Sequence, residues 1–252
     1  MGELWSVPQL LTLATDDTGG PEIFASLQGE GPSAGKPCAF IRLSRCNLAC
    51  VWCDTAYTWR FEGDLRPHRG GVSYDRKTNQ VTLSALEAAR AIDRLPPRRL
   101  VITGGEPLLQ ATALAELAAL LPDHGIEIET NGTVEPAPRL DAYIDQYTVS
   151  PKLAHSGNPA ALALLPERLR QWAAEPRAVF KFVIAAPADV TQVMALQAGF
   201  GIAPERIFLM PEGTDSAALR GRMAWLAPLC VEQGYRLSDR LHIHLYGDTR
   251  GT

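Results

Sequence analysis

Three cysteines, Cys46, Cys50 and Cys53, lie within an eight-residue stretch, separated first by three residues and then by two. Thiolates at this spacing fit on one short loop and can ligate three corners of a metal cluster. A structural zinc ion requires four protein ligands and an iron–sulfur cubane has four irons, so three local cysteines leave one position open. Because an open coordination position can accept a substrate or cofactor, the loop predicts a reactive metal centre.

A zinc loop that recruits Cys38 is an alternative for the same cysteines. Cys38 comes just before a predicted strand and lies at no spacing typical of zinc ligands. We therefore expect Cys38 and Cys230 to be small buried hydrophobic residues. Five cysteines, three of them in one loop, also argue against a secreted disulfide framework.

The elements that must position this loop alternate between short apolar strands and amphipathic helices. Strands are predicted at residues 39–43, 100–103, 125–130, 145–149, 179–184, 206–210 and 241–245. Helices are predicted at residues 84–95, 108–121, 160–173, 188–198 and 215–232. Ser84 and Glu87 form a capping-box pattern at the start of the first helix. Repeated strand–helix units imply right-handed crossovers and parallel strands, so about six units predict an α/β fold, a partial (β/α)6 TIM-like barrel.

Length and composition exclude several classes of protein. At 252 residues the chain suits one domain that spans residues 1–252. A net charge of −4 provides no basic surface for nucleic acid. No apolar stretch reaches signal-peptide or transmembrane length, so we expect a cytoplasmic protein that binds neither nucleic acid nor membrane.

Residues 58–80 interrupt the strand–helix rhythm with a polar segment that is rich in Arg and Gly and contains Pro67. The segment directly follows the cysteine loop. It is interpreted either as a surface excursion or as an insert that serves as a lid or docks a partner.

Unusual residues come directly after five of the predicted strands. In a barrel of parallel strands, the loops at the carboxyl ends of the strands build the active site. One such loop alone is weak evidence, because glycine after a strand is usually just a turn. Five loops on one rim predict a ligand site, and they occupy residues 46–53, 103–107, 129–132, 150–152 and 210–213.

The cysteine loop, with Trp52 before its last cysteine, resembles the cluster-binding loop of the radical S-adenosylmethionine superfamily. Gly-Gly-Glu-Pro at 104–107 resembles the methionine-binding motif of that superfamily. Three further segments resemble the 7-carboxy-7-deazaguanine synthase family. They are Ser-Leu-Gln-Gly-Glu-Gly at 26–31, Phe-Ile-Arg-Leu at 40–43 and Cys-Asp-Thr at 53–55. The resemblance extends from about residue 22 to residue 251. The chain departs from many members at Arg45, where they have glycine.

The resemblance implies a lyase that converts 6-carboxy-5,6,7,8-tetrahydropterin to 7-carboxy-7-deazaguanine with release of ammonia. That reaction belongs to queuosine and 7-deazapurine biosynthesis, a pathway of tRNA modification. The implied cofactors are a [4Fe–4S] cluster, S-adenosylmethionine on its fourth iron, and Mg²⁺, and the cofactors carry the hard chemistry. The implied partners are an electron donor such as flavodoxin or ferredoxin and a second copy of the chain in a homodimer.

The same resemblance assigns roles to individual residues. Cys46, Cys50 and Cys53 would each ligate one iron, and Thr55 would ligate Mg²⁺ together with the substrate carboxylate and water. The implied contacts to S-adenosylmethionine are Trp52, Asp54, Gly105, Ser150, Pro151, Lys152, Met210, Pro211, Glu212 and Gly213. The implied contacts to the substrate are Leu27, Gln28, Gly29, Glu30, Arg42, Thr103 and His244.

Arg42 is the natural cation for the substrate carboxylate, because a guanidinium can bind a carboxylate through two parallel hydrogen bonds. Glu129 and Asn131 also lie on the predicted rim but match no role, and no residue is an evident general base for the final proton loss. Structural roles stay open for three of the residues assigned above: Lys152 as a surface charge, His244 as a packed histidine and Thr55 as a turn cap.

Two other functions remain alternatives. An activase for a glycyl-radical protein would act on a protein and would lack the carboxylate-binding arginine. A non-enzymatic iron–sulfur or zinc protein would keep the cysteines without cleaving S-adenosylmethionine.

Overall fold

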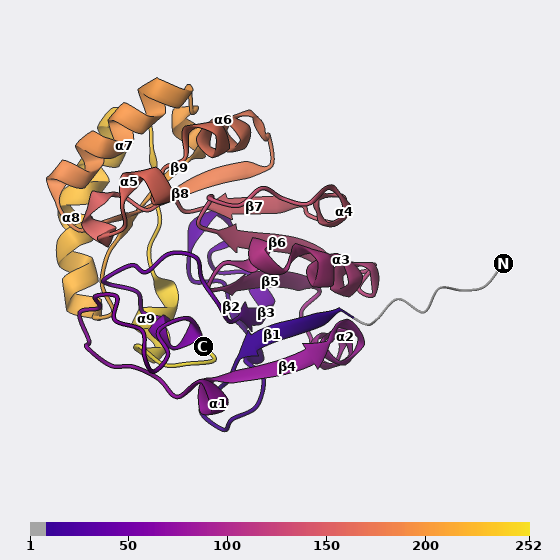
Figure 1. Cartoon of the computed structure of the whole chain (residues 1–252). Helices are drawn as coiled ribbons and strands as arrows, with labels where there is room; N and C mark the ends of the chain where they lie inside the picture. Colours follow the sequence, from indigo (N-terminus) through magenta and orange to yellow (C-terminus); the bar gives the residue numbers. More distant parts are fainter. Residues whose placement is uncertain (1–8) are drawn as a thin grey trace.

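A curved wall of parallel strands dominates the computed structural model, which describes residues 9–252 (Figure 1). Within these residues the strands form one ten-stranded sheet in the order β10-β9-β8-β7-β6-β5-β3-β1-β4, with β2 paired to β3. The parallel strands are β3 (Pro37–Leu43), β5 (Arg99–Gly104), β6 (Gly125–Thr130), β7 (Gln146–Val149), β8 (Ala178–Ile184), β9 (Ile207–Pro211) and β10 (Arg236–Leu237). The predicted α/β partial barrel is confirmed.

Helices connect the parallel strands and lie along the outside of the curved sheet (Figure 1). The long helices are α2 (Ala85–Asp93), α3 (Ala111–Ala119), α6 (Pro166–Ala174), α7 (Pro187–Phe200) and α8 (Ser216–Gln233). The short helices are α1 (Arg76–Asn79), α4 (Pro138–Asp141), α5 (Ala160–Ala163) and α9 (Leu241–Tyr246). The predicted capping box of α2 is confirmed, since the Ser84 side chain accepts from the Glu87 backbone and the Glu87 carboxylate accepts from the Ser84 backbone. No helix among residues 9–252 is both long and apolar enough to cross a membrane.

The first strand of the sheet is not the one that the sequence predicts. Strands β1 (Leu10–Ala14) and β2 (Ile23–Leu27) precede β3 and pair with it antiparallel, and β4 (Gln80–Ser84) pairs antiparallel with β1. These three strands lie outside the strand–helix repeat, so the repeat does not reveal them. The single helix predicted at 160–173 is also wrong. Pro166 begins α6 separately from α5, because proline fits the first turn of a helix and not its interior.

The strand predicted at 241–245 is wrong, because these residues form helix α9. The alternation His-Ile-His-Leu has the period of a strand, but Ile243 is the buried residue of the helix and Leu245 and Tyr246 are exposed. The backbone of Leu241 donates to the carbonyl of Gly29 (2.9 Å), so the segment docks on the chain after β2 and pairs with no strand. Tertiary contact therefore overrides the local pattern.

Side chains alternate between two environments along the parallel strands, as the two-residue period of a strand requires. One set faces the helices and forms the apolar core, for example Ile41, Ile102 and Phe182. The other set faces the inside of the barrel and is largely polar, as shown by Arg42, Thr103, Glu129, Ser150 and Lys181. The fold therefore separates a hydrophobic outer layer from a polar interior in which a ligand can bind.

Candidate active site

The carboxyl ends of the parallel strands surround a cavity of about 300 Å³. This volume lies at the lower end of the range of ~300 to 1,000 Å³ typical of ligand pockets. Of the predicted site residues, only Pro151 and His244 do not line the cavity. Those that line it are Leu27, Gln28, Gly29, Glu30, Arg42, Cys46, Cys50, Trp52, Cys53, Asp54, Thr55, Thr103, Gly105, Ser150, Lys152, Met210, Pro211, Glu212 and Gly213.

The cysteine loop leaves β3 through Arg45, whose φ of 77° is left-handed. The glycine pair after β5 packs directly against this turn. A Cβ on Gly105 would lie 2.0 Å from the Arg45 carbonyl oxygen, and one on Gly104 would lie 2.1 Å from the Leu43 carbonyl oxygen. The backbone of Gly105 donates to Leu43 and that of Glu106 donates to Arg45, both at 2.9 Å. The two glycines are therefore required by contact between two rim loops, whatever ligand binds beside them.

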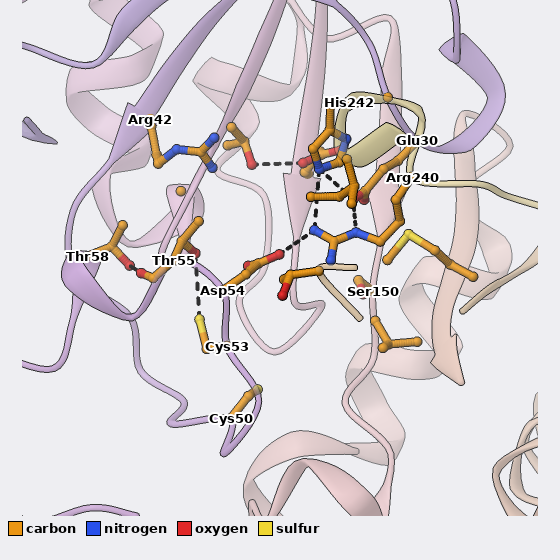
Figure 2. Close-up of a pocket in the computed structure, with 18 of the residues that line it drawn as sticks. Glu30, Arg42, Cys50, Cys53, Asp54, Thr55, Thr58, Ser150, Arg240 and His242 are labelled. Carbon is orange, nitrogen blue, oxygen red and sulfur yellow. Dashed lines mark hydrogen bonds and ion pairs between the residues drawn. The ribbon is translucent and has the colours of Figure 1, made fainter. Parts of the chain in front are cut away.

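Each sulfur of the cysteine loop has a polar neighbour that can donate to it. Asn158 Nδ2 lies 3.3 Å from Cys50 Sγ, and Asn131 Nδ2 lies 3.9 Å from Cys46 Sγ. The Thr55 hydroxyl is 3.6 Å from Cys53 Sγ (Figure 2). Hydrogen bonds to sulfur suit thiolates that ligate a cluster and tune its potential.

Burial makes these sulfurs poor thiolates unless a metal balances their charge. It raises the pKa of Cys46 to about 12 and that of Cys53 to about 11, and it also raises the pKa of Cys50. Among residues 9–252, no three His, Cys, Asp or Glu side chains are grouped to hold one metal ion. Three cysteines on one loop, each with its own hydrogen-bond donor, fit a cluster in which each cysteine binds a separate iron.

Glu106 connects the glycine motif to the next rim loop. Its carboxylate accepts hydrogen bonds from the backbone of Leu108 (3.0 Å), the backbone of Asn131 (2.7 Å) and the hydroxyl of Thr130 (2.8 Å). Asn131 in turn donates to Asn47 Oδ1 (2.9 Å) in the cysteine loop. The buried carboxylate thus holds two loops in register with the cysteines. Asn131, for which the sequence indicates no role beyond a turn, positions the cysteine loop.

Trp52 offers a flat surface at one side of the cavity. Its ring stacks on His155, with centroids 5.4 Å apart and planes 19° apart. Lys152 Nζ lies 5.8 Å from the Trp52 ring centroid and donates to the Ser150 hydroxyl (2.8 Å). Trp52 Nε1 is buried and has no hydrogen-bond partner among residues 9–252. A stacked indole with an unused donor beside a cation suits a ligand that carries an aromatic ring and a negative group.

Arg42 points into the cavity from β3 with most of its donors unused (Figure 2). Its Nε donates to Glu22 Oε1 (2.7 Å), and Tyr57 donates its hydroxyl to both oxygens of the same carboxylate (3.1 and 3.0 Å). The two terminal nitrogens of Arg42 make no hydrogen bond within residues 9–252. Glu22 and Tyr57 therefore orient a guanidinium whose free edge can bind a carboxylate.

A chain of polar and charged side chains runs through the cavity from Thr103, the register neighbour of Arg42 on β5, to Glu30. Lys181 Nζ donates to Glu30 Oε2 (2.5 Å) and Glu129 Oε1 (3.2 Å), and Thr103 donates its hydroxyl to Glu129 Oε2 (2.8 Å). Burial alone would raise the pKa of Glu30, but the charges of Lys181, Arg240 and His242 hold that pKa well below its usual value. Lys181 is not among the predicted site residues, although a lysine inside the apolar strand Val-Phe-Lys-Phe-Val is a signal that could reveal it.

Two further residues of the cavity come from the start of α9. Arg240 bonds to Glu30 and Asp54, and His242 packs so closely on Gly29 that a Cβ there would lie 2.1 Å from His242 Nδ1 (Figure 2). His244, the predicted contact, instead lies between Ser216 (2.5 Å) and Asp239 (3.1 Å), outside the cavity. Since α9 is helical, residues 242 and 244 point in different directions, whereas in a strand they would share a face.

Residues 58–80 pack on the outside of the cysteine loop. A His68 ring nitrogen lies 2.7 Å from the Cys53 carbonyl oxygen, and the Arg69 backbone donates to Val51 (2.8 Å). Trp59 and Phe61 are buried, so the start of the segment supports the loop, whereas most of residues 62–78 are exposed. A second hollow beside Cys46 is lined by Arg45, Cys46, Trp59, Phe61, Asp64, Arg66 and Arg76.

Cys38 does not join the other three cysteines. It lies near the start of β3 in an apolar cluster with Phe40 and Val101, and its thiol donates to the Lys36 carbonyl (3.4 Å). Cys230 is a residue of α8 and is buried on the side of the helix that faces the core. Both cysteines are the buried hydrophobic residues that the sequence predicts, and the zinc site that would recruit Cys38 is not formed.

Comparison with known proteins places this geometry in a family. Residues 40–159 match the Radical SAM superfamily. The chain is 38% identical over 234 residues to a 7-carboxy-7-deazaguanine synthase of Pyrobaculum aerophilum, with 91% of this chain and 95% of the relative covered. A 7-carboxy-7-deazaguanine synthase of Halobacterium salinarum is 35% identical over 257 residues, covering 92% of this chain and 91% of the relative.

The fold agrees with this assignment. The crystal structure of QueE from Escherichia coli superposes with a TM-score of 0.65 at 29% identity, covering 92% of this chain and 95% of that one. The family match at residues 40–159 contains the cysteine loop and the rim loops at 103–107, 129–132 and 150–152. The chain therefore belongs to the 7-carboxy-7-deazaguanine synthase family of radical S-adenosylmethionine enzymes.

Proposed function

We propose that this chain converts 6-carboxy-5,6,7,8-tetrahydropterin to 7-carboxy-7-deazaguanine with release of ammonia, a step of queuosine and 7-deazapurine biosynthesis. The observation that carries the proposal is one cavity that joins three cysteines to an arginine with two unused terminal nitrogens. A glycyl-radical activase would have no need of such an arginine, because its substrate is a protein.

The residues of the cavity fit the cofactors of the family. Cys46, Cys50 and Cys53 would hold a [4Fe–4S] cluster, and Trp52 and Lys152 would contact S-adenosylmethionine bound beside it. When bound, the two cofactors supply the one-electron chemistry that starts the reaction. The protein contributes the hydrogen bonds to sulfur and the buried site that excludes water.

Arg42 would bind the substrate carboxylate through its two terminal nitrogens, with Glu22 keeping the guanidinium plane in place. Gln28 is an amide of the same cavity, and its Nε2 makes a long hydrogen bond of 3.4 Å to Glu129 Oε1. Glu30 has both oxygens occupied by Lys181 and Arg240, so its contribution to substrate binding would be to hold these two cations.

Thr55 is the proposed ligand of Mg²⁺. Its hydroxyl faces the cavity, and the neighbouring Asp54 carboxylate is engaged by Arg240. One neutral oxygen is a weak ligand set, so the ion would bind only with substrate oxygens and water, which suits a cation that keeps several waters. We therefore propose that Mg²⁺ binds together with the substrate and not before it.

The hollow beside Cys46 is a suitable approach for an acidic electron donor such as flavodoxin or ferredoxin. Arg45, Arg66 and Arg76 surround it, and within residues 9–252 neither Arg45 nor Arg76 makes an ion pair. Reduction of the cluster by flavodoxin should therefore slow steeply as salt rises, because charge steering is screened within about 10 Å at 0.1 M salt. A homodimer, proposed from the family alone, is tested by sedimentation of the same protein.

The decisive experiment is anaerobic incubation of the reconstituted protein with reductant, S-adenosylmethionine, Mg²⁺ and the carboxytetrahydropterin. We expect a deazapurine product by mass spectrometry. No product from protein whose cluster absorbance is intact would contradict the proposal. Thr55→Ala should lower the Mg²⁺-dependent turnover about tenfold or more, since each lost ligand contact of about 1.4 kcal/mol is a factor of ten, while the cluster absorbance stays unchanged.

A further inference from the structure

Arg240 is the most fully bonded charged side chain of the cavity. Its side chain is 8% exposed, and all three of its nitrogens have partners. Nε donates to Glu30 Oε1 (3.0 Å), Nη1 donates to the Gly213 carbonyl (2.6 Å) and Nη2 donates to Asp54 Oδ2 (Figure 2). Three of the five N–H donors serve these partners, and Nη2 also lies 3.4 Å from His242 Nε2. At most one donor, on Nη1, remains for a ligand, so the side chain acts chiefly as a connector between loops.

The partners of Arg240 come from two sides of the cavity. Asp54 follows the last cysteine and Gly213 follows β9, and both belong to the side assigned to S-adenosylmethionine. Glu30 follows β2 on the side assigned to the substrate. Through Lys181, Glu30 is also connected to Glu129. A single guanidinium therefore joins the loops of one subsite to the charge chain of the other.

We propose that Arg240 is a positioning residue that couples the two subsites, so that S-adenosylmethionine and the pterin each increase the affinity of the other. The inference rests on the proposed function, because it needs both ligands in this cavity. A guanidinium is planar and presents its donors at fixed angles, so a shift of Asp54 or Gly213 is transmitted to Glu30. Binding of one ligand would order all three partners, and the second ligand would then bind to a site already arranged.

Such a coupling has a quantitative signature. If one ligand changes the affinity of the other by a factor, the reverse effect has the same factor, and typical values are about 5 to 150. Replacing a purely structural arginine would alter both affinities or the stability of the fold, but it would leave the coupling factor unchanged. The coupling factor therefore separates a coupling role from a packing role.

The experiment measures dissociation constants by calorimetry on the anaerobic, cluster-reconstituted protein. S-adenosylmethionine is titrated with and without saturating 6-carboxy-5,6,7,8-tetrahydropterin, and the pterin is titrated with and without S-adenosylmethionine. We expect a coupling factor of about 5 or more in the wild type. Arg240→Met and Arg240→Lys should bring the factor close to one, because a lysine cannot hold three separated partners at once.

Three further variants make the test specific. Asp54→Asn weakens the opposite end of the same bridge and should lower the coupling factor without an additional loss in the double variant with Arg240→Met. Lys181→Met interrupts the charge chain beyond Glu30, so it should weaken pterin binding and also lower the coupling factor. Arg222→Met is the matched control, because Arg222 bonds to Glu212 and not to Glu30 or Asp54, and it should leave the coupling factor at its wild-type value.

A wild-type coupling factor of one, or a factor unchanged in Arg240→Lys and Asp54→Asn with the cluster intact, would overturn the inference and leave the proposed function standing. Failure of the wild type to bind the pterin would instead contradict the proposed function itself. If Arg240→Met does not fold, as judged by circular dichroism, Arg240→Lys and Asp54→Asn decide the outcome.

Discussion

Arg42 and Arg240 are two arginines of the same cavity with opposite tasks. Both are largely buried, with side chains 17% and 8% exposed, and both pair with a glutamate. Within residues 9–252, the Arg42 side chain bonds only through Nε, whereas Arg240 uses all three nitrogens. The Arg42 guanidinium is bound at Nε and leaves its two terminal nitrogens facing the cavity. The Arg240 guanidinium has a partner at each of its three nitrogens.

The difference shows how the same side chain can be a ligand-binding group or a connector. The deciding feature is the number of donors that the protein leaves without a partner, because such a donor can bond to a charged ligand group, worth about 1.5 to 3 kcal/mol, without breaking a bond inside the protein. Arg42 therefore favours a carboxylate in the cavity, while Arg240 has most of its donors bound to the protein.

Removing the support of Arg42 should produce the largest effect. Glu22→Leu leaves a buried guanidinium without its counterion, so we expect the free energy of unfolding to fall by about 3 to 5 kcal/mol. Urea denaturation under anaerobic conditions measures this loss. Glu22→Gln keeps an oxygen that can accept from Arg42 and Tyr57 and should lose clearly less. Equal losses in the two variants would show that the charge of Glu22 is unimportant.

Arg42→Lys tests whether the two terminal nitrogens of Arg42 bind the substrate. A lysine keeps the charge but loses the paired donors, so pterin affinity should fall by about 10- to 100-fold, equivalent to 1.5 to 3 kcal/mol for a charged hydrogen bond. The affinity for S-adenosylmethionine should stay within a factor of two, as calorimetry can check. A similar fall for both ligands would mean that Arg42 resembles Arg240 in its role.

Glu30, which bonds to Arg240, should make the free energy of unfolding depend on pH. Lys181 and Arg240 hold the pKa of Glu30 below its usual 4.5, so the unfolded chain takes up a proton first as the pH falls. The stability that Glu30 contributes is therefore present above pH 4.5 and is lost below it. Between pH 5 and pH 3, cluster-free wild type should lose roughly 1 to 2 kcal/mol more than Glu30→Gln. Parallel pH profiles would contradict this assignment.

A third arginine, Arg45, matters through its backbone and should give the smallest effect. Its left-handed φ of 77° strains any residue that has a Cβ. Arg45→Gly should therefore stabilise the protein by about 1 kcal/mol, the lower end of the cost of that conformation. Thermal unfolding measures the gain, and an unchanged cluster absorbance is the control. A loss of stability would show that the exposed side chain makes a contact of its own.

The sequence predicts the parts of the site whose chemistry is local. Cys46 to Cys53 and the glycines at 104 and 105 carry their meaning in their spacing, and Arg42 is predictable because it lies on the strand that leads to the cysteines. The alternation of strands and helices likewise predicts the barrel. Each of these features depends on residues close together in the chain.

The sequence does not predict the parts that depend on distant partners. Arg240 and Glu30 are 210 positions apart, and nothing in either segment indicates the other. Helix α9 is missed because a six-residue segment takes its conformation from the surface on which it docks. The antiparallel strands β1 and β2 are missed because they pair at the edge of the repeat that makes the rest recognisable.

The contact between Gly29 and the start of α9 has a consequence for the time at which the enzyme becomes complete. The backbone of Leu241 donates to Gly29, and the Ser238 hydroxyl accepts from the backbone of Gly31. A ribosome that has made the cysteines and every parallel strand up to β9 has still not made the residues that close the cavity. The nascent chain can therefore form its parallel strands before residues 238–242 are made and close the cavity.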